Sequence, residues 1–210
     1  MALAGVRLVR RQIFIAGVII LALGAILIAY GQISRGQIES VATARDWDVT
    51  WYHVTDQFGG WGAQMGTQTL STNFHLTTVS YSGENLHLGF KASTTFELTQ
   101  DRTINFIIGS DDGSILYVDG VEQINMWLVQ GYLTRGTDLQ LTEGVHRLEM
   151  WYYQWEGGAQ VSFEYHLSGW QESVNMMVVG AVLLAIGAVI AMVGRVLKSS
   201  EEKAGAGKAV

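Results

Sequence analysis

The stretch that decides the fold is IIGSDDGSILYVDG, residues 107–120. Apolar side chains alternate with other residues on both sides of the Asp111-Asp112-Gly113 step, which is typical of half-buried strands. Asp-Gly pairs end both halves of the stretch and favour tight turns, because glycine adopts positive φ without steric cost. This segment therefore predicts short antiparallel strands joined by turns.

The same period of two recurs through the middle of the chain. The clearest runs are residues 48–53, 103–108, 114–118, 145–153 and 159–166. About 120 residues of short strands separated by Gly and Asp turns are typical of a β-sandwich. We therefore expect an all-β domain, an antiparallel β-sandwich, over residues 46–168.

Two apolar stretches enclose this region, and each predicts a transmembrane helix. Residues 13–30 contain no charge, and at about 1.5 Å per residue they cover roughly 27 Å of hydrocarbon. Residues 174–194 carry Asn175 as their one strongly polar side chain. We expect an N-terminus at 1–12, a first span at 13–31, a linker at 32–45, a second span at 174–197 and a tail at 198–210.

The flanking charges predict the orientation of the spans. Between residues 34 and 173 there are 17 acidic and 6 basic residues, a net charge of −11, whereas the tails are net positive. Basic tails stay in the cytoplasm, so we expect a multi-pass cell-membrane protein with both termini cytoplasmic. The β-domain would then lie on the extracellular or periplasmic side. The basic residues are Arg7, Arg10 and Arg11 before the first span and Arg195, Lys198, Lys203 and Lys208 after the second.

A cleaved signal peptide is the alternative for the first apolar stretch, because an Arg-rich start and the small pair Ala29 and Gly31 also fit that pattern. Signal cores usually hold 7–15 apolar residues, and this stretch holds 18. We therefore expect the segment to be retained as an anchor.

Glycine recurs every seven residues, two helical turns, in both apolar stretches. Such a stripe lets another helix approach closely. An antiparallel hairpin of the two helices is the simplest outcome, and self-association of several chains is the alternative. The residues are Gly17, Gly24 and Gly31 in the first stretch and Gly180, Gly187 and Gly194 in the second.

The decisive stretch and three later segments together resemble the PA14 domain family. The later segments are LTEGVHRL at 141–148, WYY at 151–153 and GGA at 157–159. The family's pattern is a strand, Ser-Asp-Asp-Gly-Ser, Leu-x-x-Asp-Gly, a later Leu-x-x-Gly-x-His and an aromatic strand ending in Gly-Gly-Ala. The resemblance implies a PA14-like β-sandwich used for carbohydrate binding or adhesion in toxins, glycosidases and yeast adhesins, and it implies no catalysis.

Asp111 and Asp112 match the paired aspartates that form a cis-peptide turn in PA14-like yeast adhesins. There the pair holds Ca²⁺, which coordinates vicinal sugar hydroxyls. A hard divalent cation would relieve the repulsion between two adjacent carboxylates. The alternative is a solvent-exposed turn whose side-chain oxygens bond to nearby backbone N–H groups, since two carboxylates fall short of the 6–8 ligands that calcium takes.

The adhesins complete their site from a second loop, which corresponds here to residues 154–158. The resemblance implies that Trp155 offers a face for sugar stacking and that Glu156 or Gln154 offers an oxygen ligand. The family's Asn is absent from this loop. The alternative for Trp155 is core packing, and both interpretations stay open.

Composition and spacing argue against several other functions. The chain has no cysteine, which excludes disulfides and thiolate metal sites. The five histidines show no metal spacing and no catalytic motif stands out, so we do not expect an enzyme. A domain of net charge −11 would repel nucleic acid.

Two functions therefore remain. The first is a membrane-anchored surface recognition or adhesion protein with a PA14-like carbohydrate-binding module. The second is a non-catalytic structural or accessory subunit of a larger membrane or cell-envelope assembly, whose partners are proteins instead of glycans.

Overall fold

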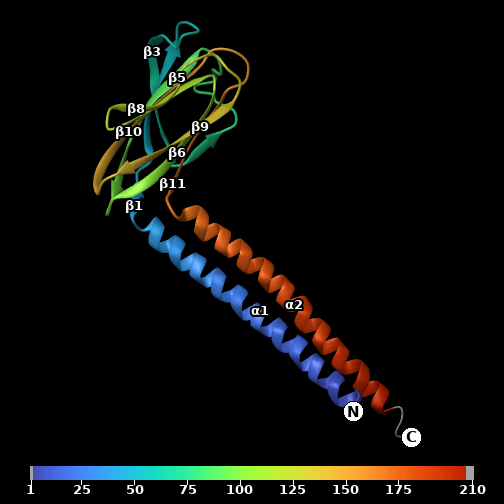
Figure 1. The fold of residues 1–210 in the computed structure, drawn as a ribbon. Helices are drawn as coiled ribbons and strands as arrows, with labels where there is room; N and C mark the ends of the chain where they lie inside the picture. The colour runs from blue at the N-terminus through green and yellow to red at the C-terminus, as the bar shows by residue number, and fades with distance from the viewer. Residues whose placement is uncertain (1, 207–210) are drawn as a thin grey trace. The chain divides into compact units, whose positions relative to one another are not determined.

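The computed structural model describes residues 2–206, with side chains from 11 to 196, as two compact units. One unit contains the two terminal helices, and the other spans residues 38–168. The helices are α1 (Ala2–Glu39) and α2 (Trp170–Ala206) (Figure 1). The side chains of Arg7, Arg10, Lys198, Lys203 and Lys208, on which the expected orientation rests, lie outside the described side chains.

Residues 38–168 fold into eleven strands arranged in two antiparallel sheets (Figure 1). The seven-stranded sheet has the order β3-β2-β5-β10-β7-β8, with β1 also paired to β5, and the four-stranded sheet has the order β4-β11-β6-β9. The all-β prediction is confirmed. The strands are β1 (Ala42–Ala44), β2 (Trp47–Val54), β3 (Trp61–Leu70), β4 (Phe74–Leu76), β5 (Leu88–Leu98), β6 (Arg102–Asp111), β7 (Gly113–Val118), β8 (Val121–Met126), β9 (Leu133–Leu141), β10 (Gly144–Gln154) and β11 (Gln160–Leu167).

Aromatic side chains join the two sheets across one core. Trp47 of β2 packs edge-on against Phe163 of β11, with ring centroids 4.8 Å apart. Phe96 of β5 makes the same kind of contact with Tyr165 of β11 at 4.9 Å. Edge-to-face pairs of this kind add to the free energy gained from burying apolar area. The alternation of buried and exposed residues along β2 and β10 is the physical basis of the period seen in the sequence, and β5 alternates in the same way.

Both terminal helices are long and apolar enough to cross a membrane. The candidate spans are Arg11–Glu39 and Trp170–Val196, each with a mean hydropathy of 2.8. Residues 32–45 differ from the expected linker, because α1 continues through Glu39 and β1 follows at once. The residues after the apolar stretch contain no proline, so nothing in the sequence interrupts helical hydrogen bonding there. The expected tail at 198–210 is also helical as far as Ala206.

The two helices pack against each other through their glycines and lie side by side in Figure 1. A Cβ atom on Gly24 would lie 2.7 Å from the carbonyl oxygen of Gly180, and one on Gly187 would lie 2.7 Å from the backbone nitrogen of Leu21. Gly17, Gly31 and Gly194 also face the opposite helix. The stripes are thus occupied within one chain, in the arrangement of the antiparallel hairpin.

Candidate functional site

The Asp111–Asp112 turn lies where the chain passes from one sheet to the other. Asp111 ends β6 of the four-stranded sheet, and β7 of the seven-stranded sheet begins directly after Asp112. The peptide bond between the two aspartates is cis. Asp112 is 1% exposed, whereas Asp111 is partly exposed. The two carboxylates therefore have different surroundings.

The Asp112 carboxylate binds the backbone of two other loops. Its Oδ1 accepts a hydrogen bond from the Gln130 N–H at 3.0 Å. Its Oδ2 accepts from the Trp155 N–H at 2.7 Å and from the Glu156 N–H at 3.1 Å. Hydrogen bonds to a carboxylate are stronger than those to a neutral acceptor. Asp112 thus holds the β8–β9 loop and the β10–β11 loop together beside Asp111.

The Asp111 carboxylate is the more available of the pair. Burial and the nearby charge of Asp112 raise the pKa of Asp111 above 3.8, although the backbone N–H of Tyr132 acts in the opposite direction. A Cβ atom on Gly158 would lie 3.3 Å from Asp111 Oδ2, so a glycine at this position leaves the approach to the carboxylate open. The charged form of Asp111 is therefore disfavoured and would gain from a neighbouring cation.

Gln154 braces the β10–β11 loop and does not offer its side chain to a ligand. It is fully buried, its Nε2 donates to the carbonyl oxygen of Glu156 at 2.6 Å, and its Oε1 lies 3.3 Å from the Tyr152 hydroxyl. The hydroxyl of Tyr152 also donates to the carbonyl oxygen of Asp111 at 2.8 Å. Gln154 therefore differs from the oxygen ligand that we expected from the resemblance.

Trp155 and Glu156 are both accessible at this end of the domain. Trp155 is half-buried, and its ring lies 4.2 Å from the ring of His87, between centroids. Glu156 is exposed, and its backbone N–H donates a hydrogen bond to the Asp112 carboxylate, which fixes its position. Trp155 lies outside the apolar core, so the core-packing alternative does not describe its place.

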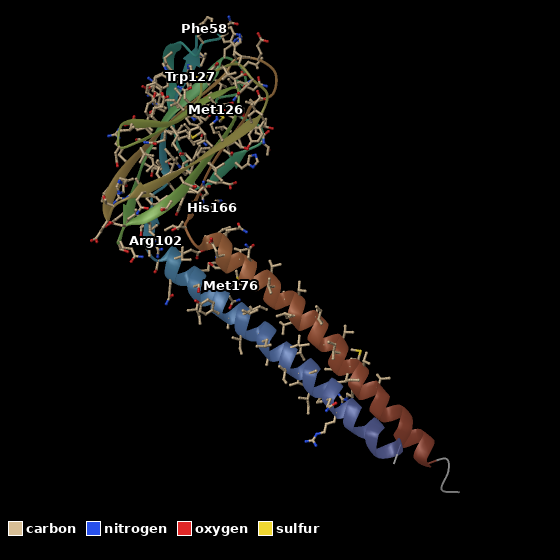
Figure 2. All side chains as sticks on the ribbon, viewed as in Figure 1. Phe58, Arg102, Met126, Trp127, His166 and Met176 are labelled. Atoms are coloured by element: carbon tan, nitrogen blue, oxygen red, sulfur yellow. The ribbon has the colours of Figure 1, made fainter. Side chains whose placement is uncertain are left out.

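Two further loops extend the surface around the turn. The Trp127 indole donates to the carbonyl oxygen of Phe58 at 2.7 Å, which ties the β2–β3 loop to the loop after β8. Figure 2 shows the two residues at the same end of the β-domain. Phe58 is 75% exposed, and Leu128 and Val129 are also exposed. We call these three exposed side chains the apolar rim; Leu128 and Val129 directly precede Gln130, whose N–H binds Asp112.

No signal in the sequence marks Gln130 or His87 as parts of this site. Gln130 contributes its backbone N–H, which every residue except proline can supply. His87 comes from a loop about 25 residues before the aspartates in the chain. Neither contact can be inferred without knowing which loops the sheets bring together.

Side chains alone do not supply enough ligands for a metal ion at the Asp111–Asp112 turn. Across the described residues, no group of three or more His, Cys, Asp or Glu side chains lies close enough to hold a metal ion. Asp111 and the remaining lone pair of Asp112 Oδ1 are the carboxylate donors of the turn. The donors fit a Ca²⁺ ion only if backbone carbonyls, water or ligand hydroxyls supply the other positions.

Comparison with solved structures identifies the fold. No protein-family model and no curated protein matches this chain. The PA14 sugar-binding domain from an RTX adhesin superposes with a TM-score of 0.50 at 21% identity, covering 60% of this chain and 92% of that domain. The β-domain has a PA14-like fold. The likeness at this identity concerns the fold alone.

Two other solved structures, both of longer chains, each match about three fifths of this chain. An anti-sigma factor domain-containing protein gives a TM-score of 0.51 at 19% identity, covering 60% of this chain and 44% of that chain. A β-glucosidase from Kluyveromyces marxianus gives 0.46 at 11% identity, covering 61% of this chain. This chain spans only 18% of the glucosidase.

Proposed function

We propose that residues 38–168 form a carbohydrate-recognition module that α1 and α2 anchor in a membrane. In this proposal the sugar binds at the end of the sandwich that carries Asp111, Asp112, Trp155 and Glu156. The observation that supports it most is the buried Asp112 carboxylate, which fixes two loops around the more available carboxylate of Asp111. Such preorganisation lowers the entropic cost of binding.

Each accessible group has a defined part in the proposed site. Asp111 binds Ca²⁺, whose remaining positions are filled by sugar hydroxyls, water and backbone carbonyls. Trp155 stacks on the C–H face of the sugar, and its ring is oriented by His87. Glu156 accepts hydrogen bonds from sugar hydroxyls. When bound, calcium supplies positive charge that offsets the repulsion between the two carboxylates.

The solved PA14 sugar-binding domain of an RTX adhesin supports the choice of ligand class. The proposal places the module on the extracellular or periplasmic side, with both termini cytoplasmic, because the tails are basic and the domain is acidic. It includes no catalytic step. The alternative, an accessory subunit with protein partners, draws support from the exposed apolar rim of Phe58, Leu128 and Val129.

The test is a glycan array probed with the full chain in lipid nanodiscs, with about 1 mM Ca²⁺ or with a chelator, since calcium modules outside cells bind in this range. We expect calcium-dependent glycan binding that Asp111→Asn abolishes. Asp48→Asn is the matched control, because it removes one exposed carboxylate from β2, away from the turn. A stoichiometric protein partner without any glycan affinity would instead favour the accessory subunit.

A further inference from the structure

A row of polar and aromatic side chains extends from Asp111 over the outer face of the four-stranded sheet. Asp111 at the end of β6 is paired with Gln160 of β11. Two positions further along β11, Ser162 is paired with His75 of β4. Directly paired residues point to the same face of a sheet. Val161 between them belongs to the core, so Gln160 and Ser162 point outward on the same face as Asp111.

Tyr132, which directly precedes β9, connects Asp111 to this row. Its backbone N–H binds the Asp111 carboxylate, and its ring lies parallel to the His75 ring, with an interplanar angle of 10° and centroids 5.9 Å apart. Its hydroxyl lies 2.9 Å from Ser162 Oγ. A Cβ atom on Gly109 would collide with the Tyr132 hydroxyl and lie 2.7 Å from Ser162 Oγ, so this glycine lets Tyr132 lie against the sheet. Both the backbone and the ring of Tyr132 are therefore held in place.

The side chains of Gln160 and His75 form a pair that keeps hydrogen-bonding groups unused. Gln160 Nε2 lies 2.6 Å from His75 Nε2. A glutamine NH₂ group only donates, so the neutral His75 ring accepts there and carries its proton on Nδ1. In the part of the chain that the structure describes, neither His75 Nδ1 nor Gln160 Oε1 has a hydrogen-bond partner. The pair thus keeps one donor and one acceptor, and His75 is exposed.

We propose that His75, Tyr132 and Gln160 form a second saccharide subsite, so that the module binds a chain of at least two linked sugars. This inference rests on the proposed function, because the first sugar is held at Asp111. None of the three residues is Asp, Glu, Lys or Arg, so they recognise a ligand by hydrogen bonding and ring contact. One donor, one acceptor and the exposed ring of His75 suit the hydroxyls and the C–H face of a neutral pyranose.

The spacing of the strands sets the length of the ligand. Adjacent strands lie about 4.8 Å apart, so β4 lies about 10 Å from β6 across β11. A single pyranose ring bound at Asp111 does not reach His75, whereas the next ring of a linked saccharide does. The second sugar therefore lies over β11 and β4, beside the Tyr132 ring.

The test measures calcium-dependent binding of the full chain in lipid nanodiscs to six immobilised probes. These are galactose, glucose and mannose, and the disaccharides galactobiose, cellobiose and mannobiose. We expect at least one disaccharide to bind about tenfold more tightly than its monosaccharide, the gain that two further hydrogen bonds give. Gln160→Ala and His75→Ala should each remove most of that gain, whereas Asp111→Asn should abolish the binding of both sugars.

The matched control is Gln140→Ala. Gln140 of β9 lies opposite Thr103, at the far end of β6 from Asp111, and accepts a hydrogen bond from its hydroxyl at 2.6 Å. Its loss should leave both affinities unchanged. Unchanged tryptophan fluorescence shows that all variants fold.

The outcomes separate this inference from the function on which it rests. If every disaccharide binds no more tightly than its monosaccharide, the second subsite is overturned and the proposed function stands. The same conclusion follows if Gln160→Ala lowers both affinities equally. If none of the six probes binds the unmodified chain in calcium, the proposed function is contradicted and the second subsite with it.

Discussion

Replacing Asp112 by Asn should destabilise the β-domain strongly, whereas replacing Asp111 by Asn should not. The two substitutions remove the same charge from adjacent residues. They differ because Asp112 is buried and accepts three backbone hydrogen bonds, whereas burial and the charge of Asp112 raise the pKa of Asp111. The pair therefore separates a structural carboxylate from a ligand-binding one.

The expected cost of Asp112→Asn follows from its three bonds. An Asn oxygen at the Oδ2 position can still accept from Trp155 and Glu156, but without the charge each bond weakens by roughly 1 kcal/mol. The Asn NH₂ then faces the Gln130 N–H, which loses its acceptor at a cost of about 1–3 kcal/mol. Relief of the repulsion with Asp111 offsets part of this, so we expect a loss of about 2–4 kcal/mol.

Asp111→Asn should act in the other direction when calcium is absent. A carboxyl group with a raised pKa contributes stability below its ordinary pKa of 3.8, and that contribution is lost as the pH rises through the raised value. At pH 7 the charge of Asp111 is therefore unfavourable. Its removal should leave the free energy of unfolding unchanged or slightly higher.

Denaturant unfolding of the full chain in detergent measures both effects. Six of the seven tryptophans lie in residues 38–168, so tryptophan fluorescence reports on the β-domain. The unmodified chain and both variants should be compared with calcium chelated. If Asp112→Asn costs less than about 0.5 kcal/mol, a typical value for an exposed surface position, the role assigned to Asp112 is refuted.

Three further predictions concern other parts of the molecule. His146 is hydrogen-bonded to Asp119 at 2.7 Å; burial alone lowers its pKa, but the bonds to Asp119 and to a backbone carbonyl outweigh this and raise it above 6.5. The unmodified chain should therefore have a higher free energy of unfolding than His146→Gln, by the full amount below pH 6.5, and this difference should disappear as the pH rises through the raised pKa. A pH series of denaturant titrations measures the difference. Gly24→Leu should separate the helices and speed amide hydrogen exchange in α2, while Gly36→Leu, where an added Cβ meets nothing within 4 Å, should not. Lys91 lies 4.5–5.8 Å from three aromatic ring centroids, so Lys91→Met should lower the thermal unfolding temperature, and Lys91→Arg should lower it less.

The fold class could be predicted from the sequence because apolar and polar residues alternate along a strand that has one side buried. β6, β7 and β10 show that pattern and were expected from the sequence. β3 and β9 were not expected, because they are edge strands with mostly exposed side chains and no regular apolar period. The central strand β5 was also missed, although its buried positions alternate. The continuation of α1 through Glu39 was also missed, since hydropathy marks where a membrane core ends and not where helical hydrogen bonding ends.

The site could be predicted only in part. The Asp111–Asp112 turn carries a local motif, so its position was found from the sequence. The different environments of the two carboxylates depend on backbone N–H groups at positions 130, 155 and 156, which no side-chain motif records. For the same reason Gln154 was taken for a ligand, although its side chain is consumed in bracing its own loop.

A crystal structure of the protein grown with saturating Ca²⁺ and a bound saccharide would test the central claim most directly. We predict density for a cation 2.3–2.6 Å from an Asp111 carboxylate oxygen, as calcium requires, with sugar hydroxyls completing its shell beside Trp155. A well-ordered turn with neither cation nor sugar density at Asp111 under these conditions would contradict the assignment of this end of the sandwich as a sugar-binding site.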